Sequence, residues 1–89
     1  MPQRELTLIN KRGLHARAAT KLVQCCQQFE ARVSVKHQER EADAANIMSL
    51  LMLAAPCGSV LTIDAEGSQA EEVLDALDTL FEARFHEDA

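Results

Sequence analysis

The sequence predicts a two-layer α/β domain in which helices cover one face of a small sheet. The chain has 89 residues, enough for a single modest core. Its composition is 47% hydrophobic, 26% charged and only 3% aromatic, which fits helices packed on a sheet and not a disordered chain. Segments with strand and helix periodicity follow in the order β-α-β-β-α-β-α. No repeat or linker divides the chain, so residues 1–89 are expected to form one domain.

The first half of the chain is predicted to contain three strands and one helix. Residues 6–9 favour a short strand, which is followed by a loop ending at Gly13. Residues 16 to about 28 have a helical period. Residues 32–36 alternate strictly, as in a half-buried strand, and residues 41–43 are expected to pair back as a third strand. The side chains expected to face the core are those of Ala19, Leu22, Val23 and Cys26 in the helix and Val33 and Val35 in the strand.

The second half is predicted to contain a short helix, a strand and a longer helix. Asn46 is a good N-cap for a helix over residues 47–53 that ends before Pro56. Residues 60–66 alternate again and predict a strand. The core face of this strand is expected to consist of Leu61, Ile63 and Ala65.

The last helix is expected to begin at a capping box. Ser68 and Glu71 have the spacing in which each side chain accepts from the other residue's backbone N–H. The tail over residues 85–89 is expected to fray. The core face of this helix is expected to contain Ala70, Val73, Leu74, Leu77, Leu80 and Phe81.

Charge is divided unevenly along the chain. Residues 1–40 hold eight basic residues and three acids, whereas residues 41–89 hold one basic residue and eleven acids, so that +5 and −10 give the net charge of −5. Four cations and no acid lie between Asn10 and Lys21. A cationic end on an acidic molecule suits an anionic ligand or an acidic protein better than nucleic acid. The lack of Tyr and Trp also argues against nucleic-acid binding.

The sequence contains no signal for a membrane, a disulfide or a metal. No apolar run approaches the roughly 18 residues that span a bilayer, and no signal peptide is apparent, so a soluble cytoplasmic protein is expected. The three cysteines form no CxxC pair and are expected to be reduced and mostly buried. His37 and His86 lack metal-ligand spacing and are expected on the surface.

One segment indicates chemistry. His15 follows Gly13 and Leu14 at the start of the first helix, where backbone N–H groups lack internal partners and lie at the positive end of the helix dipole. The backbone N–H groups of Ala16 and Arg17, the Arg17 guanidinium and Arg12 are therefore candidate phosphate ligands. These positive surroundings are expected to keep His15 neutral and nucleophilic, as a phosphohistidine intermediate requires. The alternative is an ordinary helix-start histidine beside solvated cations.

The helix predicted over residues 47–53 is apolar nearly all round. One face must enter the core, and a thin domain can hardly bury both faces. The remaining side chains, Ile47, Met48 and Leu51, are a candidate partner-binding surface. The alternative is that loops cover the whole helix.

Two motifs together resemble one family. The run Asn10-x-x-Gly13-Leu14-His15-Ala16-Arg17 and the later run from Asn46 to Leu51 are similar to those of the HPr family, the histidine-containing phosphocarriers of the bacterial phosphoenolpyruvate-dependent phosphotransferase system. The similarity extends over essentially the whole chain. It implies an α+β open-faced β-sandwich, with a four-stranded antiparallel sheet and three helices on one face.

The resemblance also implies a function for individual residues. His15 would accept a phosphoryl group on its Nδ1 from phospho-enzyme I and pass it to an EIIA acceptor. Arg17 would stabilise the phosphate, as would the first backbone N–H groups, including that of Ala18. Partners would be contacted through Ile47, Met48 and Leu51, with Lys21 helping to attract acidic surfaces. The protein would be a monomeric carrier without cofactor or metal, and not a turnover enzyme.

The chain departs from the usual family pattern at two positions. Ala18 replaces a proline, and it retains a helical start and a backbone N–H. Asn46 stands where many sugar-branch members have a regulatory serine, and Asn caps a helix equally well but cannot be phosphorylated. Ser49 lies inside the predicted helix and does not match that position, so the family's seryl regulation is not carried over to it. The stretch 50–53 and the acidic ending 80–88 resemble the nitrogen-branch members, called NPr. The alternatives are a sugar-branch HPr, a regulatory binding module that transfers no phosphate, and a domain that binds small phosphometabolites at the helix start.

Overall fold

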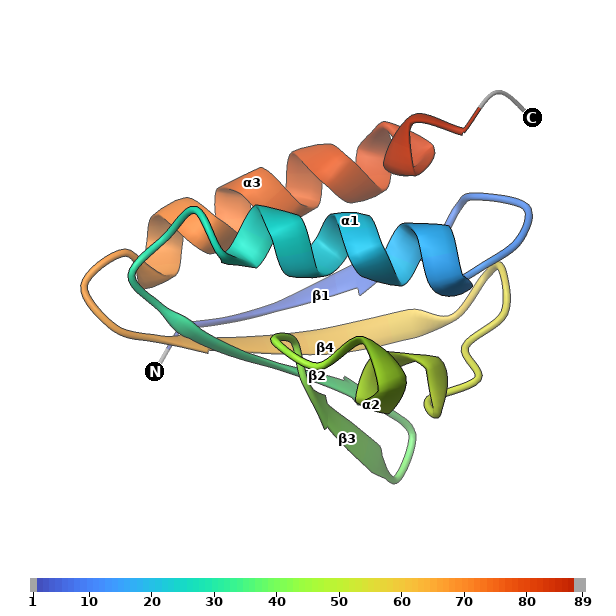
Figure 1. The fold of residues 1–89 in the computed structure, drawn as a ribbon, viewed down its shortest axis with the longest axis horizontal. Helices are drawn as coiled ribbons and strands as arrows, with labels where there is room; N and C mark the ends of the chain where they lie inside the picture. Colours follow the sequence, from blue (N-terminus) through green and yellow to red (C-terminus); the bar gives the residue numbers. More distant parts are fainter. Residues whose placement is uncertain (1, 88–89) are drawn as a thin grey trace.

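The computed structural model describes residues 2–87 and contains a four-stranded sheet covered on one face by helices (Figure 1). The longer helices α1 and α3 lie side by side over the sheet, and α2 packs against α1 and β3. The elements are β1 (Gln3–Thr7), α1 (Ala16–Cys26), β2 (Arg32–His37), β3 (Arg40–Asp43), α2 (Ile47–Leu51), β4 (Val60–Glu66), α3 (Ala70–Glu82) and the 3₁₀ turn η1 (Arg84–His86).

The sheet is antiparallel throughout, in the order β1-β4-β2-β3. Its central strand pair places Val35 opposite Ile63, and β1 places Leu6 opposite Leu61. These apolar side chains are buried and face the helices, as the alternating pattern predicted. The predicted open-faced sandwich with three helices is confirmed.

The core contains the side chains predicted for the faces of both long helices. Ala19, Leu22 and Val23 of α1 are buried against the sheet, together with the predicted face of α3 up to Phe81. Leu80 is only partly buried at the edge of this core. Ala18 is an addition to the predicted set, since its methyl group is fully buried.

Several element boundaries differ from the prediction, the first strand and the ends of two helices most clearly. The first strand covers Gln3–Thr7 and not 6–9, because the polar residues before Leu6 pair with β4 at the sheet edge. Leu8 continues this alignment only through two hydrogen bonds, with Ser59 and Gly58, outside the regular ladder. Helix α1 ends at Cys26, before residue 28, and α2 ends at Leu51, before residue 53.

The predicted capping box of the last helix is wrong. Helix α3 has Gln69 as its N-cap, without a capping hydrogen bond from a side chain. The Ser68 hydroxyl instead donates to the Glu30 carboxylate at 3.3 Å. The Gln69 side-chain oxygen accepts from the Glu30 backbone N–H at 2.8 Å, so the helix start is fixed by the loop before β2.

The predicted fraying of the tail is also wrong for residues 85–87, while residues 88 and 89 lie outside the described part of the chain. Phe85 is fully buried and packs on Phe81, with the ring centroids 5.0 Å apart. An aromatic ring in the core stabilises this segment more than chain-end entropy destabilises it. Residues 85–87 therefore lie near the N-terminal end of α1 (Figure 1).

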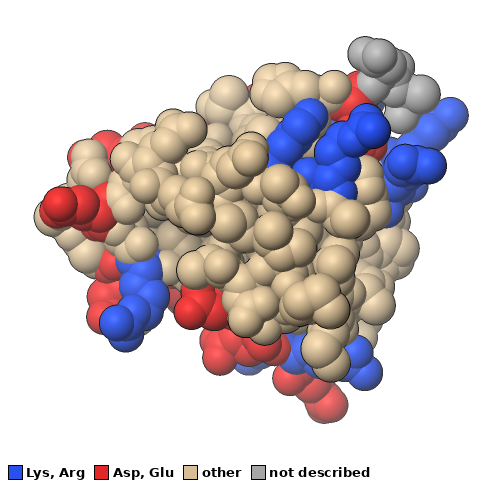
Figure 2. Space-filling model, viewed as in Figure 1, with Lys and Arg blue, Asp and Glu red and all other residues tan. Residues whose placement is uncertain are grey.

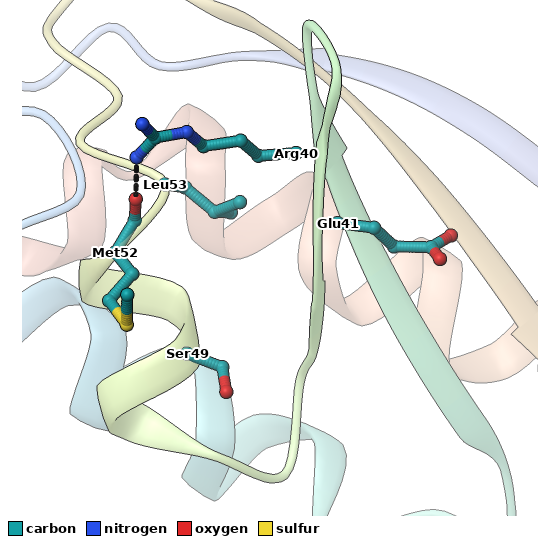
Figure 3. Close-up of a pocket in the computed structure, with 5 residues that line it drawn as sticks. All are labelled: Arg40, Glu41, Ser49, Met52 and Leu53. Atoms are coloured by element: carbon teal, nitrogen blue, oxygen red, sulfur yellow. Dashed lines mark hydrogen bonds between the residues drawn. The ribbon is translucent and has the colours of Figure 1, made fainter.

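The turn between β2 and β3 supports the C-terminal end of α2. The Arg40 guanidinium donates to the Met52 carbonyl at 2.8 Å, beside a hollow of about 350 Å³ that is also lined by Glu41, Ser49 and Leu53 (Figure 3). His37, expected on the surface, is partly exposed there, and its Nδ1 lies 3.3 Å from the Leu53 carbonyl. His86 is exposed as predicted.

The cysteines differ in burial. Cys26 is buried and Cys25 partly buried, as expected, but Cys57 is exposed. Burial raises the pKa of the Cys25 thiol and raises that of Cys26 to about 12. Among residues 2–87, no helix is both long and apolar enough to cross a membrane.

Candidate functional site

The loop before α1 is fixed by a close approach to the segment after α2. The Leu14 backbone N–H donates to the Ala55 carbonyl at 2.9 Å. Gly13 has a φ of +63°, and a Cβ at this position would stand 2.4 Å from the Ala55 oxygen and 2.8 Å from Pro56. Only glycine fits both the conformation and the space. The sequence therefore fixes where the next residues, Leu14 and His15, must lie.

His15 is the N-cap of α1. Its backbone is extended, with φ −87° and ψ −178°, and its carbonyl accepts the first intrahelical hydrogen bond from Ala19 at 2.8 Å. Its Nδ1 accepts from the backbone N–H of Arg17 at 3.3 Å. The side chain thus partly satisfies a helix start that would otherwise lack acceptors.

This capping bond determines the tautomer of neutral His15. A backbone N–H only donates, so Nδ1 must present its lone pair and the imidazole proton must lie on Nε2. The Nε2–H then donates to Oε1 of Glu87 at 2.6 Å. The unprotonated, nucleophilic nitrogen is therefore Nδ1, which faces the N-terminal end of the helix.

Glu87 is a site residue that the sequence analysis missed. Its side chain is 8% exposed, and the same Oε1 also accepts from the Asn10 side-chain amide at 2.9 Å. Asn10 is fully buried and donates to the Gly13 carbonyl as well, at 2.7 Å. Asn10 thus connects the loop before α1 to the end of the chain, and its Oδ1 has no hydrogen-bond partner among the described residues.

The carboxylate changes the electrostatics expected at the site. The hydrogen bond from His15 is the main cause that lowers the pKa of Glu87, and the Asn10 hydrogen bond and the coulombic effects of His15 and Arg12 act in the same direction. Burial acts in the opposite direction and raises the pKa of Glu87. Glu87 is therefore ionised at neutral pH. The expected surroundings of His15 were wholly positive, and the structure adds an anion at Nε2.

The predicted phosphate ligands lie around the start of α1. Ala16, Arg17 and Ala18 form the first turn, where backbone N–H groups point out of the helix end. The Arg17 side chain is exposed and forms no ion pair within residues 2–87. Arg12 is also exposed, and its charge acts on Glu87. The arrangement provides a nucleophilic nitrogen beside backbone and side-chain donors for an anion.

The surface around the start of α1 is also cationic. Figure 2 shows a group of Lys and Arg side chains at the end of the molecule where α1 begins, with acidic side chains along the lower and left edges of this face. Among residues 2–87, no three His, Cys, Asp or Glu side chains form a group that could hold a metal ion.

The predicted partner surface is partly exposed. Met48 is 67% exposed, Ile47 and Leu51 are partly buried against the core, and Leu50 is fully buried. Met52, which the sequence analysis did not single out, is 68% exposed and extends this apolar surface. The helix therefore buries one face and leaves the other open, and the alternative of a helix wholly covered by loops is wrong.

Lys21 has a contact that the sequence did not indicate. It was predicted to help attract partners, but its ammonium group donates to the Phe85 carbonyl at 2.5 Å. Its charge is thus directed toward the C-terminal turn. Contact with a partner through Lys21 stays a prediction.

Comparisons with known proteins agree with this geometry. The family model described as "PTS HPr component phosphorylation site" matches residues 2–83. The chain belongs to the HPr family. It is 45% identical over 87 residues to "Phosphocarrier protein HPr" of Cupriavidus necator, covering 98% of each chain. It is 41% identical to "Phosphocarrier protein NPr" of Shewanella violacea, covering 96% of this chain and 93% of the relative.

Solved HPr structures share the fold. The crystal structure of HPr-C-His from Thermoanaerobacter tengcongensis superposes with a TM-score of 0.94 and 34% identity, covering both chains completely. HPr from Bacillus anthracis superposes with a TM-score of 0.85 and 36% identity, covering 90% of this chain and 95% of that one. The protein is thus an HPr-family phosphocarrier of the phosphotransferase system, and relatives carry both the HPr and NPr names.

Proposed function

We propose that this HPr-family protein accepts a phosphoryl group from phospho-enzyme I on Nδ1 of His15 and passes it to an EIIA component of the nitrogen branch. The observation that carries the proposal is the placement of His15 at the N-terminus of α1. Its Nδ1 lone pair faces the helix start while Nε2–H is bound to Glu87. A neutral imidazole with a defined free nitrogen is what nucleophilic phosphoryl transfer requires.

The transfer exchanges one P–N bond for another. The Nδ1 lone pair forms a bond to phosphorus as the bond to the donor histidine of enzyme I breaks, and Nε2 keeps its proton. The Arg17 guanidinium, Arg12 and the first N–H groups of α1 then surround the phosphoryl oxygens. Ala18 supplies a further N–H where the usual proline has none. The reverse exchange delivers the group to a histidine of EIIA.

The partner surface next to this site supports brief contacts. The exposed side of Ile47, Met48 and Leu51 offers adaptable apolar contact. Arg12 and Arg17 favour acidic partner surfaces and raise the rate of encounter. A carrier must release each partner, so a small interface and a monomeric carrier are expected.

The nitrogen branch is favoured by the stretch 50–53 and the acidic ending, which resemble NPr. Asn46 supports the same assignment, since its Oδ1 caps α2 by accepting from the Ser49 N–H at 3.1 Å and offers no hydroxyl for phosphorylation. The runner-up is the sugar branch, because the 45% identical relative bears the HPr name. A regulatory module without transfer needs neither His15 nor Arg17, yet both are present.

The test is phosphorylation by phosphoenolpyruvate with purified enzyme I of either branch, followed by intact mass under alkaline conditions, which preserve phosphohistidine. One added phosphate is expected, and it should be absent in His15→Ala. Arg17→Gln should slow labelling by about 100-fold, as loss of a preorganised charge does. The faster donor identifies the branch. If the folded protein is labelled by neither donor, transfer is excluded and the regulatory module takes its place.

A further inference from the structure

Residues 84–86, which follow α3, form an unusual turn. Arg84, Phe85 and His86 all have positive φ, at 55°, 54° and 61°. The left-handed region is unfavourable for residues with a Cβ, and three such residues in succession are rare. Surrounding contacts must therefore hold this turn in place.

Two contacts attach Phe85, the middle residue of this turn, to other elements. The Phe85 ring is fully buried and packs on Phe81 of α3. The Phe85 carbonyl accepts from the Lys21 ammonium at 2.5 Å, across 64 residues of sequence. The first contact fixes the ring in the core, and the second attaches the backbone of the turn to α1.

The turn places Glu87 on His15. Glu87 follows directly after the three left-handed residues and reaches both His15 and Asn10 with one carboxylate oxygen. Because the backbone direction at Glu87 depends on the turn, the contact of Lys21 in the middle of α1 and the contact of His15 at its start belong to one connected arrangement.

We infer that Lys21 is a positioning residue for His15. Lys21 acts through the Phe85 carbonyl and Glu87, and keeps the imidazole of His15 oriented with Nδ1 free. Its consequence for phosphoryl transfer rests on the proposed function. The positioning itself does not, because it is a property of the protein alone.

The chemistry explains why this positioning matters. Bonding of phosphorus to Nδ1 places positive charge on the ring, and the Nε2–H becomes a stronger donor. A carboxylate held at Nε2 stabilises that charge, and no proton needs to leave. If Glu87 moves away, the ring can rotate about its side-chain bonds, and fewer molecules have Nδ1 in the attacking orientation.

The test compares Lys21→Met with Lys36→Met. Methionine keeps the apolar stem of lysine and removes the ammonium group, while Lys36 is an exposed residue of β2 whose replacement changes the net charge equally. Carbon-13 NMR of the Glu87 carboxyl reports its titration, on which His15, Asn10 and Arg12 act. Nitrogen-15 NMR of His15 reports solvent exchange of the Nε2 proton.

In Lys21→Met, the pKa of Glu87 should rise toward its ordinary value, and the Nε2 proton should exchange about tenfold faster as the hydrogen bond opens more often. Lys36→Met should leave both unchanged. Lys21→Arg keeps a cationic donor, so both the pKa of Glu87 and the exchange rate of the Nε2 proton should stay close to those of the unmodified protein. With enzyme I present, Lys21→Met should also be labelled several-fold more slowly.

A double-mutant cycle with Glu87→Ala separates this role from general stabilisation. If Lys21 acts through Glu87, adding Lys21→Met to Glu87→Ala should slow labelling no further. Fully additive effects would overturn the inference, and so would an unchanged Glu87 titration in folded Lys21→Met. Either result is compatible with normal labelling of the unmodified protein, so the inference can fail while the proposed function holds. If enzyme I does not label the unmodified protein, the proposed function is contradicted, and the positioning role of Lys21 is not.

Discussion

Two helix starts in this protein solve the same problem with different side chains. Helix α1 begins at His15, whose Nδ1 accepts from the N–H two residues later at 3.3 Å. Helix α2 begins at Asn46, whose Oδ1 accepts from the N–H three residues later at 3.1 Å. Asparagine is among the preferred N-caps, and histidine is not. The start of α1 therefore has a weaker N-cap residue than asparagine would be at the same position.

The difference shows what the inferior cap provides. The Nδ1 lone pair that caps α1 is the lone pair that would attack phosphorus, so the helix start orients the nucleophile in the unphosphorylated protein. In the proposed phosphorylated form, the phosphoryl oxygens replace Nδ1 as acceptors for the same N–H groups. The cap of α2 has no such second use, since an amide oxygen is a poor nucleophile.

The largest effect is expected from exchanging one cap for the other. His15→Asn should abolish labelling completely, as His15→Ala does, because neither has an imidazole nitrogen. Both variants lose the contact with Glu87, so the difference between them isolates the cap. We expect His15→Asn to be more stable than His15→Ala by about 1 kcal/mol in urea unfolding. Equal stability would mean that the start of α1 does not depend on a side-chain cap.

A smaller effect is expected at the second helix start. Asn46→Ala should lower the free energy of unfolding by about 1 kcal/mol, since the Ser49 N–H loses its acceptor. Asn46→Ser, which retains a capping oxygen, is the matched control and should lose much less. Both variants should still accept one phosphate per chain. Loss of labelling in Asn46→Ala alone would show that α2 serves the site and not only the partner surface.

The smallest effect is expected in the pH dependence of stability, in which the two helix starts should differ. The pKa of Glu87 is lowered in the folded protein, so its ionised form stabilises the fold fully above the ordinary pKa of glutamate. This contribution is lost as the pH falls through the lowered, folded-state value. The stability advantage of the unmodified protein over Glu87→Gln should therefore shrink on acidification.

Unfolding curves between neutral pH and about pH 3 measure this difference. Glu82→Gln removes an exposed carboxylate of α3 and controls for net charge. An advantage over Glu87→Gln that grows on acidification would contradict the assignment of the His15–Glu87 contact. The Asn46 cap contains no titratable group, so this pH response belongs to the first helix start only.

The sequence predicted what depends on local pattern. Alternation located β2 and β4, helical periodicity located α1 and α3, and the position of His15 after Gly13 indicated the helix start. The first strand was placed too late, because polar residues such as Arg4 give no apolar signal. Arg4 pairs instead with acids of α3, at 2.8 Å from Asp75.

What the sequence could not predict depends on contacts between distant residues. His15 and Glu87 are 72 positions apart, and nothing near either one indicates the other. The only available signal was the spacing of Phe81 and Phe85, four residues apart, which marks a tail that continues to pack. The failed capping box has a similar cause, since Ser68 and Gln69 bond to Glu30 from another loop.

The close approach that makes Gly13 necessary also has a practical consequence. Pro56, which a side chain at position 13 would strike, is followed by the exposed thiol of Cys57. Cys26 is buried and Cys25 partly buried, and burial raises the pKa of both thiols. Because exposed thiols react faster than buried ones, a maleimide dye should attach to Cys57 first. The native chain thus offers a preferred labelling position beside the histidine loop, from which fluorescence can report the arrival and departure of each partner.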